Sequence, residues 1–309
     1  MNKFFFNKYK GEIILLIVTL LWSATFVIVK GALKDISSML FIGLRFLIAG
    51  IILLPFLLRR KHLFLNKKFL HPIILGTILF FGFSSQTIGL KHTEATKSAF
   101  LTGTAVVIIP FIQLLIEKRK PKTGSVIGVA VVLAGILLLS GGNSILTLVK
   151  DIIANFNLGD FLTLVGALFY AIYVVYLDIL SNKYEFEFLL IIQMLVPALL
   201  ALPFAFIFDV ISYEAIHIEF TSELILAVLY TAIFATVVTT GLQTKYQPLV
   251  TPTKAGIVYS FEPIFAAIVA FAFLNERITL FGILGAGLIF VGLIISETFD
   301  NLIVRLKRS

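Results

Sequence analysis

The feature that most constrains this chain is a series of long apolar runs, each about 20 residues, separated by short polar connections. A helix that crosses the ~30 Å hydrocarbon core of a bilayer needs about 20 apolar residues, whereas barrel strands need about 10 and alternate in polarity. Because unpaired backbone groups in lipid cost several kcal/mol each, such runs must be helical. Ten spanning helices are predicted, at 11–33, 38–58, 69–90, 95–116, 123–140, 159–178, 187–208, 222–243, 251–273 and 278–297.

Composition supports an all-α integral membrane protein. Of the 309 residues, 59% are hydrophobic and 14% charged, against about 25% charged in ordinary soluble domains. The first apolar run, after Lys10, is longer than the apolar region of a signal peptide and is interpreted as a spanning helix. The chain has no cysteine, and its four histidines lie at segment ends without metal-site spacing.

The basic residues predict how the chain is oriented, because short cytoplasmic loops are enriched in Lys and Arg. With the N-terminus inside, the cytoplasmic segments hold 17 basic residues and the outer loops hold 4, and another four lie within or at the ends of helices. Both termini are therefore expected on the cytoplasmic side of the cell membrane. The net charge of +8 is then a topology and lipid-contact signal rather than a sign of nucleic-acid binding.

The second half of the chain repeats the first. At an offset of 148, Gly11-Glu12 corresponds to Gly159-Asp160; at an offset of 157, Gln86-Thr87 and Thr96-Lys97 correspond to Gln243-Thr244 and Thr253-Lys254. The change in offset predicts a nine-residue insertion, expected in the acidic outer loop around 209–221. Because each copy has five helices, the second copy enters the membrane from the opposite side. The pattern is therefore that of an inverted-topology repeat, as in many secondary transporters.

The repeat predicts the domain organisation. A first five-helix repeat is expected at 1–140, an outer linker at 141–158, a second repeat at 159–300 and a basic cytoplasmic tail at 301–309.

Glu262 is the first candidate for function, since a carboxylate in the middle of a spanning helix is costly unless it faces the bundle interior or water. It could accept a proton or the cationic group of a substrate. It could equally be a structural acid that bonds a neighbouring helix, where Pro263 frees a backbone carbonyl. In the first copy its counterpart is Ala105, and that of Tyr259 is Thr102. These unpaired residues are therefore the first place to seek substrate choice or coupling.

Other candidates are polar or aromatic residues placed at mid-membrane or at mirrored depths. Trp and Tyr usually favour membrane interfaces, so mid-membrane rings indicate either a cavity wall or core packing. The two glutamines could bond a ligand, neighbouring helices or the mirrored gates. The full set of candidate substrate-binding residues is Trp22, Phe26, Gln86, Tyr170, Tyr173, Gln243, Tyr259 and Glu262.

Four basic residues are candidates for gating or ion pairing. Arg45 could grip a substrate carboxylate or close an ion pair between the halves. Lys30, Lys97 and Lys254 lie near helix ends and could simply extend to the interface. For Lys97 and Lys254, their repeated position also favours a gate or substrate contact.

A family resemblance follows from specific motifs. They are Trp22 with Phe26 and Lys30, Arg45, Gly89-Leu90-Lys91-His92-Thr93, Ala99-Phe100-Leu101-Thr102-Gly103, Pro110, Glu262-Pro263, Asn275-Glu276-Arg277, Gly285 and Gly292. The sequence resembles an EamA-type member of the drug/metabolite transporter superfamily across nearly its whole length. The resemblance implies two inverted halves around a central cavity, and movement of small metabolites, often amino acids, usually without ATP. One departure is that Arg119-Lys120 stands where the second copy has Glu276-Arg277.

The resulting hypothesis is a secondary transporter of small organic metabolites, most simply an amino-acid or metabolite exporter working by alternating access. No enzyme motif, metal set or cofactor site is recognised. The expected partners are a small-molecule substrate, the bilayer and possible coupling protons or ions, and the protein is expected to be a monomer or homodimer. One alternative is an importer of a quaternary amine or other cationic nutrient. Another, of a different class, is an intramembrane enzyme acting on lipid-linked substrates.

Overall fold

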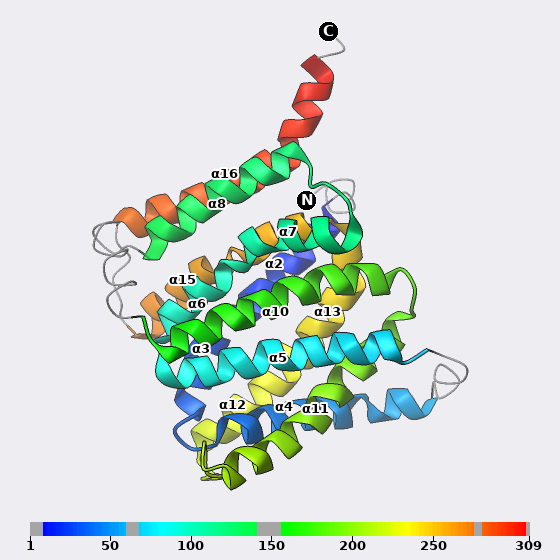
Figure 1. Cartoon of the computed structure of the whole chain (residues 1–309). Helices are drawn as coiled ribbons and strands as arrows, with labels where there is room; N and C mark the ends of the chain where they lie inside the picture. The colour runs from blue at the N-terminus through cyan, green and yellow to red at the C-terminus, as the bar shows by residue number, and fades with distance from the viewer. Residues whose placement is uncertain (1–8, 60–67, 141–155, 275–279, 307–309) are drawn as a thin grey trace.

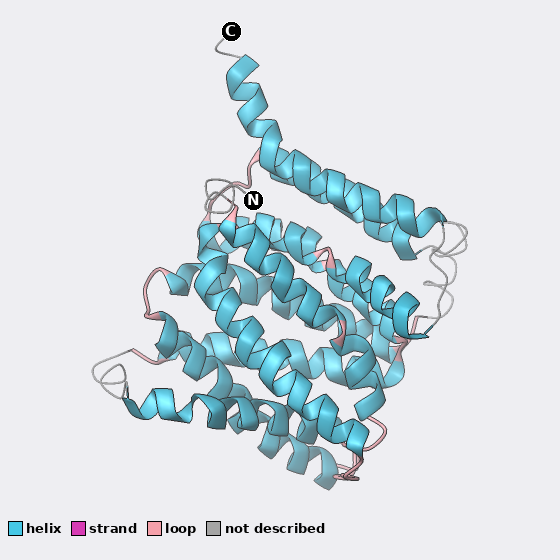
Figure 2. Cartoon of the chain, turned by 180° about the vertical axis from the view of Figure 1, so that it is seen from behind, coloured by secondary structure: helices cyan, strands magenta, loops and turns pink. Residues whose placement is uncertain are grey.

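The computed structural model describes residues 9–59, 68–140, 156–274 and 280–306. Within these ranges the secondary structure is helical apart from one isolated bridge between Ile36 and Ile218. The prediction of an all-helical chain is therefore confirmed (Figure 2). Among the described residues, seven segments are long and apolar enough to cross a membrane, and two further apolar helices, Thr123–Leu138 and Leu280–Ser296, are shorter. Most of the linker predicted at 141–158, and the Asn275-Glu276-Arg277 motif, lie outside the described residues.

The described helices follow the predicted segments closely. In the first half they are α2 (Lys10–Ser23), α3 (Thr25–Ala32), α4 (Ser38–Arg59), α5 (Leu70–His92), α6 (Ala95–Gly103), α7 (Ala105–Glu117) and α8 (Thr123–Ser140). In the second half they are α10 (Leu158–Ser181), α11 (Phe186–Val210), α12 (Ser222–Ala232), the π-helix η2 (Ile233–Val238), α13 (Thr239–Tyr246), the short 3-10 helix η3 (Gln247–Leu249), α14 (Pro252–Tyr259), α15 (Glu262–Leu274) and α16 (Leu280–Leu306).

Three of the predicted helices are interrupted near their middle. The breaks fall at Ala24, at Thr104, and at Ser260 with Phe261. Ser or Thr hydroxyls at each break donate to carbonyls of the preceding turn, as from Thr104 Oγ1 to Leu101 O at 2.5 Å, a contact that bends helices. Just after the third break, Pro263 has no N–H to continue the ladder. A fourth irregularity is the π-helix η2.

Helices from the two halves pack in pairs. α4 lies against α11, α5 against α10, α8 against α16, and α2 against α13 (Figure 1). Glycines permit the closest approaches: a Cβ on Gly128 would lie 2.7 Å from the Gly292 carbonyl oxygen, and one on Gly135 would lie 2.7 Å from the Gly285 oxygen. Small residues at such contacts let helix backbones meet in a membrane, where packing rather than the hydrophobic effect drives association.

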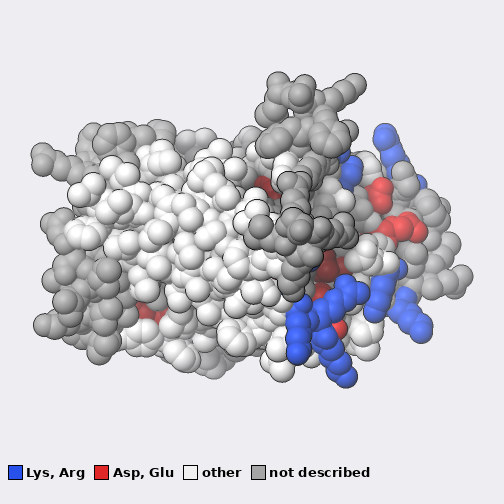
Figure 3. Space-filling model, turned by 90° about the horizontal axis from the view of Figure 1, so that it is seen from above, with Lys and Arg blue, Asp and Glu red and all other residues white. Residues whose placement is uncertain are grey.

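The surface is apolar around the helices and charged at their ends. Along α16, the exposed side chains include Leu280, Ile283, Leu284, Phe290, Val291 and Ile294, and in Figure 3 the charged side chains gather toward one end of this face. That end, called here the basic end, carries the exposed Lys118, Arg119, Lys120 and Lys122. The opposite end, the acidic end, carries Asp35, Asp209, Glu214 and Glu219. Such an apolar belt is typical of a lipid-facing surface.

The insertion predicted in the acidic loop lies mostly in a helical span instead. Ser222–Leu249 covers 28 residues where its counterpart α5 has 23. The longer span contains η2 and η3. Five of the nine additional residues therefore lie in this span and not in the acidic loop, which corrects the expectation about the loop.

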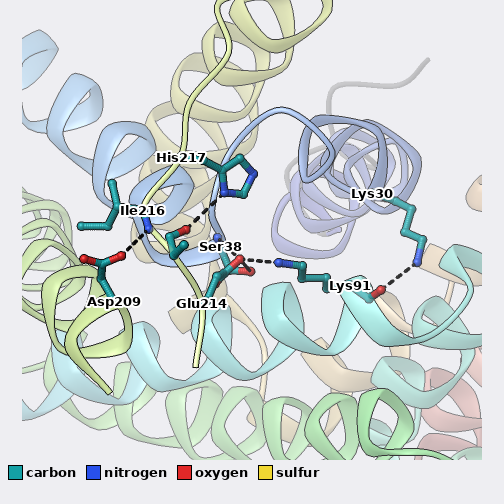
Figure 4. A network of polar contacts seen from close by, with 8 residues as sticks. Lys30, Ser38, Lys91, Asp209, Glu214, Ile216 and His217 are labelled. Atoms are coloured by element: carbon teal, nitrogen blue, oxygen red, sulfur yellow. Dashed lines mark hydrogen bonds and ion pairs between the residues drawn. The ribbon is translucent and has the colours of Figure 1, made fainter. Parts of the chain in front are cut away.

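The acidic loop fastens the ends of three helices together. Glu214 accepts hydrogen bonds from Ser38 N (3.0 Å) and Ser38 Oγ (3.2 Å) at the start of α4, and pairs with Lys91 Nζ at 2.7 Å. Figure 4 shows this carboxylate between the two elements, with Lys30 reaching the carbonyl of Lys91 from α3. A carboxylate at a helix N-terminus satisfies its open N–H groups and its positive dipole.

Candidate functional site

A cavity of about 80 Å³ lies at the centre of the bundle, between the two halves. One water needs roughly 10–15 Å³ of such space, so the cavity holds a few small molecules of that size. It is lined by Trp22, Thr25, Leu79, Phe83, Gln86, Thr102, Gly103, Ala105, Val106, Ile109, Tyr170, Tyr173, Val174, Thr240, Gln243, Gly256, Tyr259, Ser260 and Glu262.

Seven of the eight predicted substrate-binding residues line this one cavity. The exception is Phe26, which is buried at 3% exposure in an apolar cluster with α4 and α12 residues. Sequence reasoning did not single out Thr25, Phe83, Thr240 and Ser260, although they line the cavity too. A single hydroxyl or phenyl group in an apolar helix does not by itself indicate a binding site. Only its correspondence to a candidate residue in the other copy could have indicated that it lines the cavity.

The lining residues come in pairs that correspond between the two copies. At offset 148, Trp22 corresponds to Tyr170 and Thr25 to Tyr173; at offset 157, the pairs are Phe83 with Thr240, Gln86 with Gln243, Thr102 with Tyr259, Gly103 with Ser260, and Ala105 with Glu262. Their hydrogen bonds correspond as well: Gln86 Nε2 donates to Thr102 Oγ1 at 3.0 Å, and Gln243 Nε2 donates to the Tyr259 hydroxyl at 3.0 Å.

The aromatic rings of the cavity are held by their polar tips. Trp22 Nε1 donates to Thr239 Oγ1 (3.0 Å) and to the Ala235 carbonyl (3.3 Å), and its ring centroid lies 5.6 Å from that of Tyr259. The Tyr170 hydroxyl donates to Gln86 Oε1 at 3.0 Å. Because these tips already have protein partners, the rings present mainly their carbon faces to the cavity.

Two buried glutamines, not among the predicted site residues, anchor the tyrosines. The Tyr259 hydroxyl donates to Gln247 Oε1 at 3.0 Å, and Gln247 Nε2 donates to the Val174 carbonyl at 2.7 Å. Tyr173 donates its hydroxyl proton to Gln193 Oε1. Gln193 and Gln247 are both fully buried, so they position the wall without facing the lumen.

Glu262 is the acidic residue of the cavity. It begins α15 directly after the break at Ser260 and Phe261, and it is 8% exposed. No described residue makes a hydrogen bond or ion pair with its carboxylate. The structural alternative, a bond to a neighbouring helix, therefore has no counterpart among the described contacts. A buried carboxylate without a partner is costly, which favours a ligand-binding role.

The helix interruptions meet at this cavity. Thr25 follows the break at Ala24, Gly103 and Ala105 flank the break at Thr104, and Ser260 and Glu262 flank the third. The breaks at Thr104 and Phe261 occupy equivalent positions in the two copies, 157 residues apart. Discontinuous helices of this kind form midplane sites in transporters, because interrupted backbone is tolerated in a membrane only where it is buried or lines a cavity.

Arg45 lies behind the cavity wall rather than in it. Its guanidinium donates to Thr236 Oγ1 at 2.5 Å and to the Ala235 carbonyl at 2.7 Å, and it lies 4.4 Å from the ring centroid of Phe83. It therefore joins α4 to the π-helix η2 by hydrogen bonds to neutral groups. An ion pair between the halves, one of the two expectations for this residue, is not what these contacts form.

The other basic candidates lie at helix ends. Lys30 donates to the carbonyls of Leu90 (2.6 Å) and Thr93 (2.8 Å), and so caps the C-terminus of α5. Lys97 pairs with Asp160 at 2.6 Å, at the acidic end. Lys254 lies near the start of α14, toward the basic end. The pair of Lys97 with Asp160 joins the first half to the second.

The fold and this cavity define a multi-pass helical membrane protein of the transporter class. The EamA-like transporter family model matches residues 9–141 and again 157–298, so the chain belongs to that family, and with it to the drug/metabolite transporter superfamily. An uncharacterized transporter of Archaeoglobus fulgidus is 33% identical over 94% of this chain and 86% of its own length. The uncharacterized transporter YoaV of Bacillus subtilis is 27% identical over 92% and 96%, respectively.

A solved crystal structure has the same fold. It superposes with a TM-score of 0.75 at 16% identity, over 97% of this chain and 99% of that one. At this identity the likeness establishes the fold and leaves the substrate open.

Proposed function

We propose that this chain is a secondary transporter that moves small organic metabolites across the cell membrane by alternating access. The observation that carries the proposal is the central cavity, formed where interrupted helices of both halves meet. Ten spanning helices are arranged as two inverted five-helix repeats, with the substrate bound between them.

Three observations support the inverted repeat. The family model matches the chain twice, in 9–141 and 157–298. The helix pairings are the same when each helix is replaced by its counterpart in the other copy. The pair α5–α10 then becomes the pair α13–α2, which is also observed, and the pairs α4–α11 and α8–α16 each consist of two counterparts. The cavity is lined by equivalent residues from both copies. Two similar halves of opposite orientation have two similar states, each open to one side.

Contacts at the acidic end support a closed outer entrance. Lys97 of α6 and Asp160 of α10 join the two halves there, and Thr93 adds a hydrogen bond to the same carboxylate at 2.5 Å. We take the acidic end as the outer face and the basic end as cytoplasmic, with both termini inside, because short cytoplasmic loops are rich in Lys and Arg. The helix interruptions then supply the points at which the cavity opens to either side.

The test is transport by purified protein in liposomes, with a panel of amino acids, amines, nucleosides and sugars under proton, sodium and potassium gradients. We expect saturable movement of at least one metabolite without ATP. Ala105→Trp adds bulk at a cavity-lining position and should abolish that transport. Its matched control is Gly287→Trp on the outer surface of α16, where nothing lies within 4 Å of an added Cβ, and this variant should leave transport unchanged. Absence of transport for every compound and gradient would refute the proposal.

A further inference from the structure

We propose that the cavity binds a small organic cation, an ammonium compound without a free carboxylate, with its nitrogen at Glu262 and its carbon skeleton against Trp22 and Tyr259. This inference rests on the proposed transport function and names the substrate class of the same site. It differs from the expectation of amino-acid export, which requires a partner for a substrate carboxylate.

The first argument is charge. Glu262 lines the cavity at 8% exposure, and among the described residues no Lys or Arg lines it. Arg45 is separated from the lumen by Phe83 and is already hydrogen-bonded to Ala235 and Thr236. A ligand ammonium group would therefore meet a carboxylate, whereas a ligand carboxylate would enter beside Glu262 with no cation to compensate it.

The second argument is the hydrogen-bonding capacity of the wall. A carboxylate ligand needs donors, and most donors of this wall are directed at protein acceptors. Gln243 Nε2 donates to both Gln247 and Tyr259. Six further lining donors are directed in the same way, namely those of Trp22, Thr25, Gln86, Tyr170, Tyr173 and Ser260. The wall is thus poor in free donors and suits a ligand that brings its own.

The third argument is the aromatic surface. Trp22 and Tyr259 lie with ring centroids 5.6 Å apart, and both are fixed by hydrogen bonds through their polar tips. Faces of such rings attract ammonium groups through their negative quadrupole, Trp most strongly. The repeat adds a further point: the counterpart of Glu262 is Ala105, so among the described residues the cavity offers one carboxylate and suits a single positive charge.

The experiment compares ligands that differ only in the carboxylate. Tyramine and tyrosine, and phenethylamine and phenylalanine, are tested for binding to detergent-purified protein by thermal shift and for counterflow in proteoliposomes; choline and its uncharged isostere 3,3-dimethylbutanol test the charge itself. A ligand that binds only the folded state raises the apparent stability of the protein. We expect each amine to give the same thermal shift at a concentration at least tenfold lower than the corresponding amino acid. This comparison uses the wild-type chain and does not depend on any variant folding.

The matched variants are Glu262→Gln, which keeps the shape and removes the charge, and Glu219→Gln, at an exposed carboxylate of the acidic loop. We expect Glu262→Gln to weaken amine binding by about tenfold to a hundredfold, the usual value of a hydrogen bond to a charged group, and Glu219→Gln to leave it unchanged. Transport of amino acids or uncharged metabolites, with none of the amines bound, would overturn the inference while leaving the transport function standing. Equal amine affinity in folded Glu262→Gln protein would also overturn it, and failure of every compound would remove both.

Discussion

Replacing Lys97 with Met should destabilise the protein more than removing any other charged side chain at a helix end or in an exposed loop. Asp160 is fully buried and accepts three hydrogen bonds, from Lys97 Nζ at 2.6 Å, Thr93 Oγ1 at 2.5 Å and Asn157 N at 3.0 Å. The side chain of Lys97 is 21% exposed. Its removal would leave a buried carboxylate with two neutral donors and no cation.

The expected cost follows from that geometry. Removing one partner of a buried ion pair costs about 3–5 kcal/mol, and the two remaining donors place Lys97→Met near the lower end, at about 3 kcal/mol. Adding Asp160→Asn should recover part of this loss, since the uncompensated charge is then gone. Lys91→Met is the control. Lys91 is 36% exposed and its partner Glu214 is 7% exposed, and Glu214 keeps two hydrogen bonds from Ser38, so the cost should be smaller than for Lys97→Met, at about 1–2 kcal/mol.

The assay is unfolding by SDS titration in mixed micelles, with free energies measured for wild type, both single variants, the double variant and the control. Contacting residues should show a coupling of about 0.5–3 kcal/mol. The reasoning about this pair would be refuted if the changes in unfolding free energy of the two single variants added up to that of the double variant. It would also be refuted if Lys97→Met lowered the unfolding free energy no more than Lys91→Met does.

Three further predictions concern the repeat and the packing. The repeat maps Lys97 onto Lys254 and Asp160 onto Glu12, so a double-mutant cycle with Glu12→Gln and Lys254→Met should show coupling of the same sign; additivity would contradict the mirrored pair. Gly128→Ile should destabilise by about 1–3 kcal/mol or more, since its Cβ would lie 2.7 Å from the Gly292 oxygen, whereas Gly287→Ala, with open space around it, should be neutral or stabilising by SDS titration. Tyr173→Phe would leave Gln193 Oε1 without its buried donor and should cost about 1–3 kcal/mol; an unchanged unfolding free energy would show that the contact is dispensable.

The positions of the helices could be predicted from the sequence because hydropathy is local. Each predicted segment overlaps a described helix or an interrupted series of helices, and α4, predicted at 38–58, is observed at Ser38–Arg59. The exception in extent is α16, which was predicted to end at 297 but continues to Leu306. The grouping of Trp22, Gln86, Tyr170, Gln243 and Glu262 was also within reach, because the repeat assigns equivalent depths to residues far apart in the chain. What the repeat could not assign was direction around each helix, and Phe26 accordingly lies in an apolar cluster instead of the cavity.

The roles of the basic side chains were beyond sequence reasoning. Lys30 ends on backbone carbonyls 60 and 63 residues away, and backbone carbonyls are present at every position, so no residue pattern marks them as partners. The same holds for Arg45, whose partners Ala235 and Thr236 lie in the π-helix η2, an irregularity that no residue pattern marks.

The sequence by itself determined that the chain lies in lipid, that its long apolar segments are helical and that its second half repeats the first. Each of these properties depends on residue type and order alone. Only the tertiary structure decided where the extra residues of the second copy are absorbed, and which carboxylate is paired. Asp160 meets Lys97 across the two halves, while Glu262 faces the cavity without a described partner. Both are single acids in apolar segments; the difference between them is set by neighbours that only the packing of distant helices brings together.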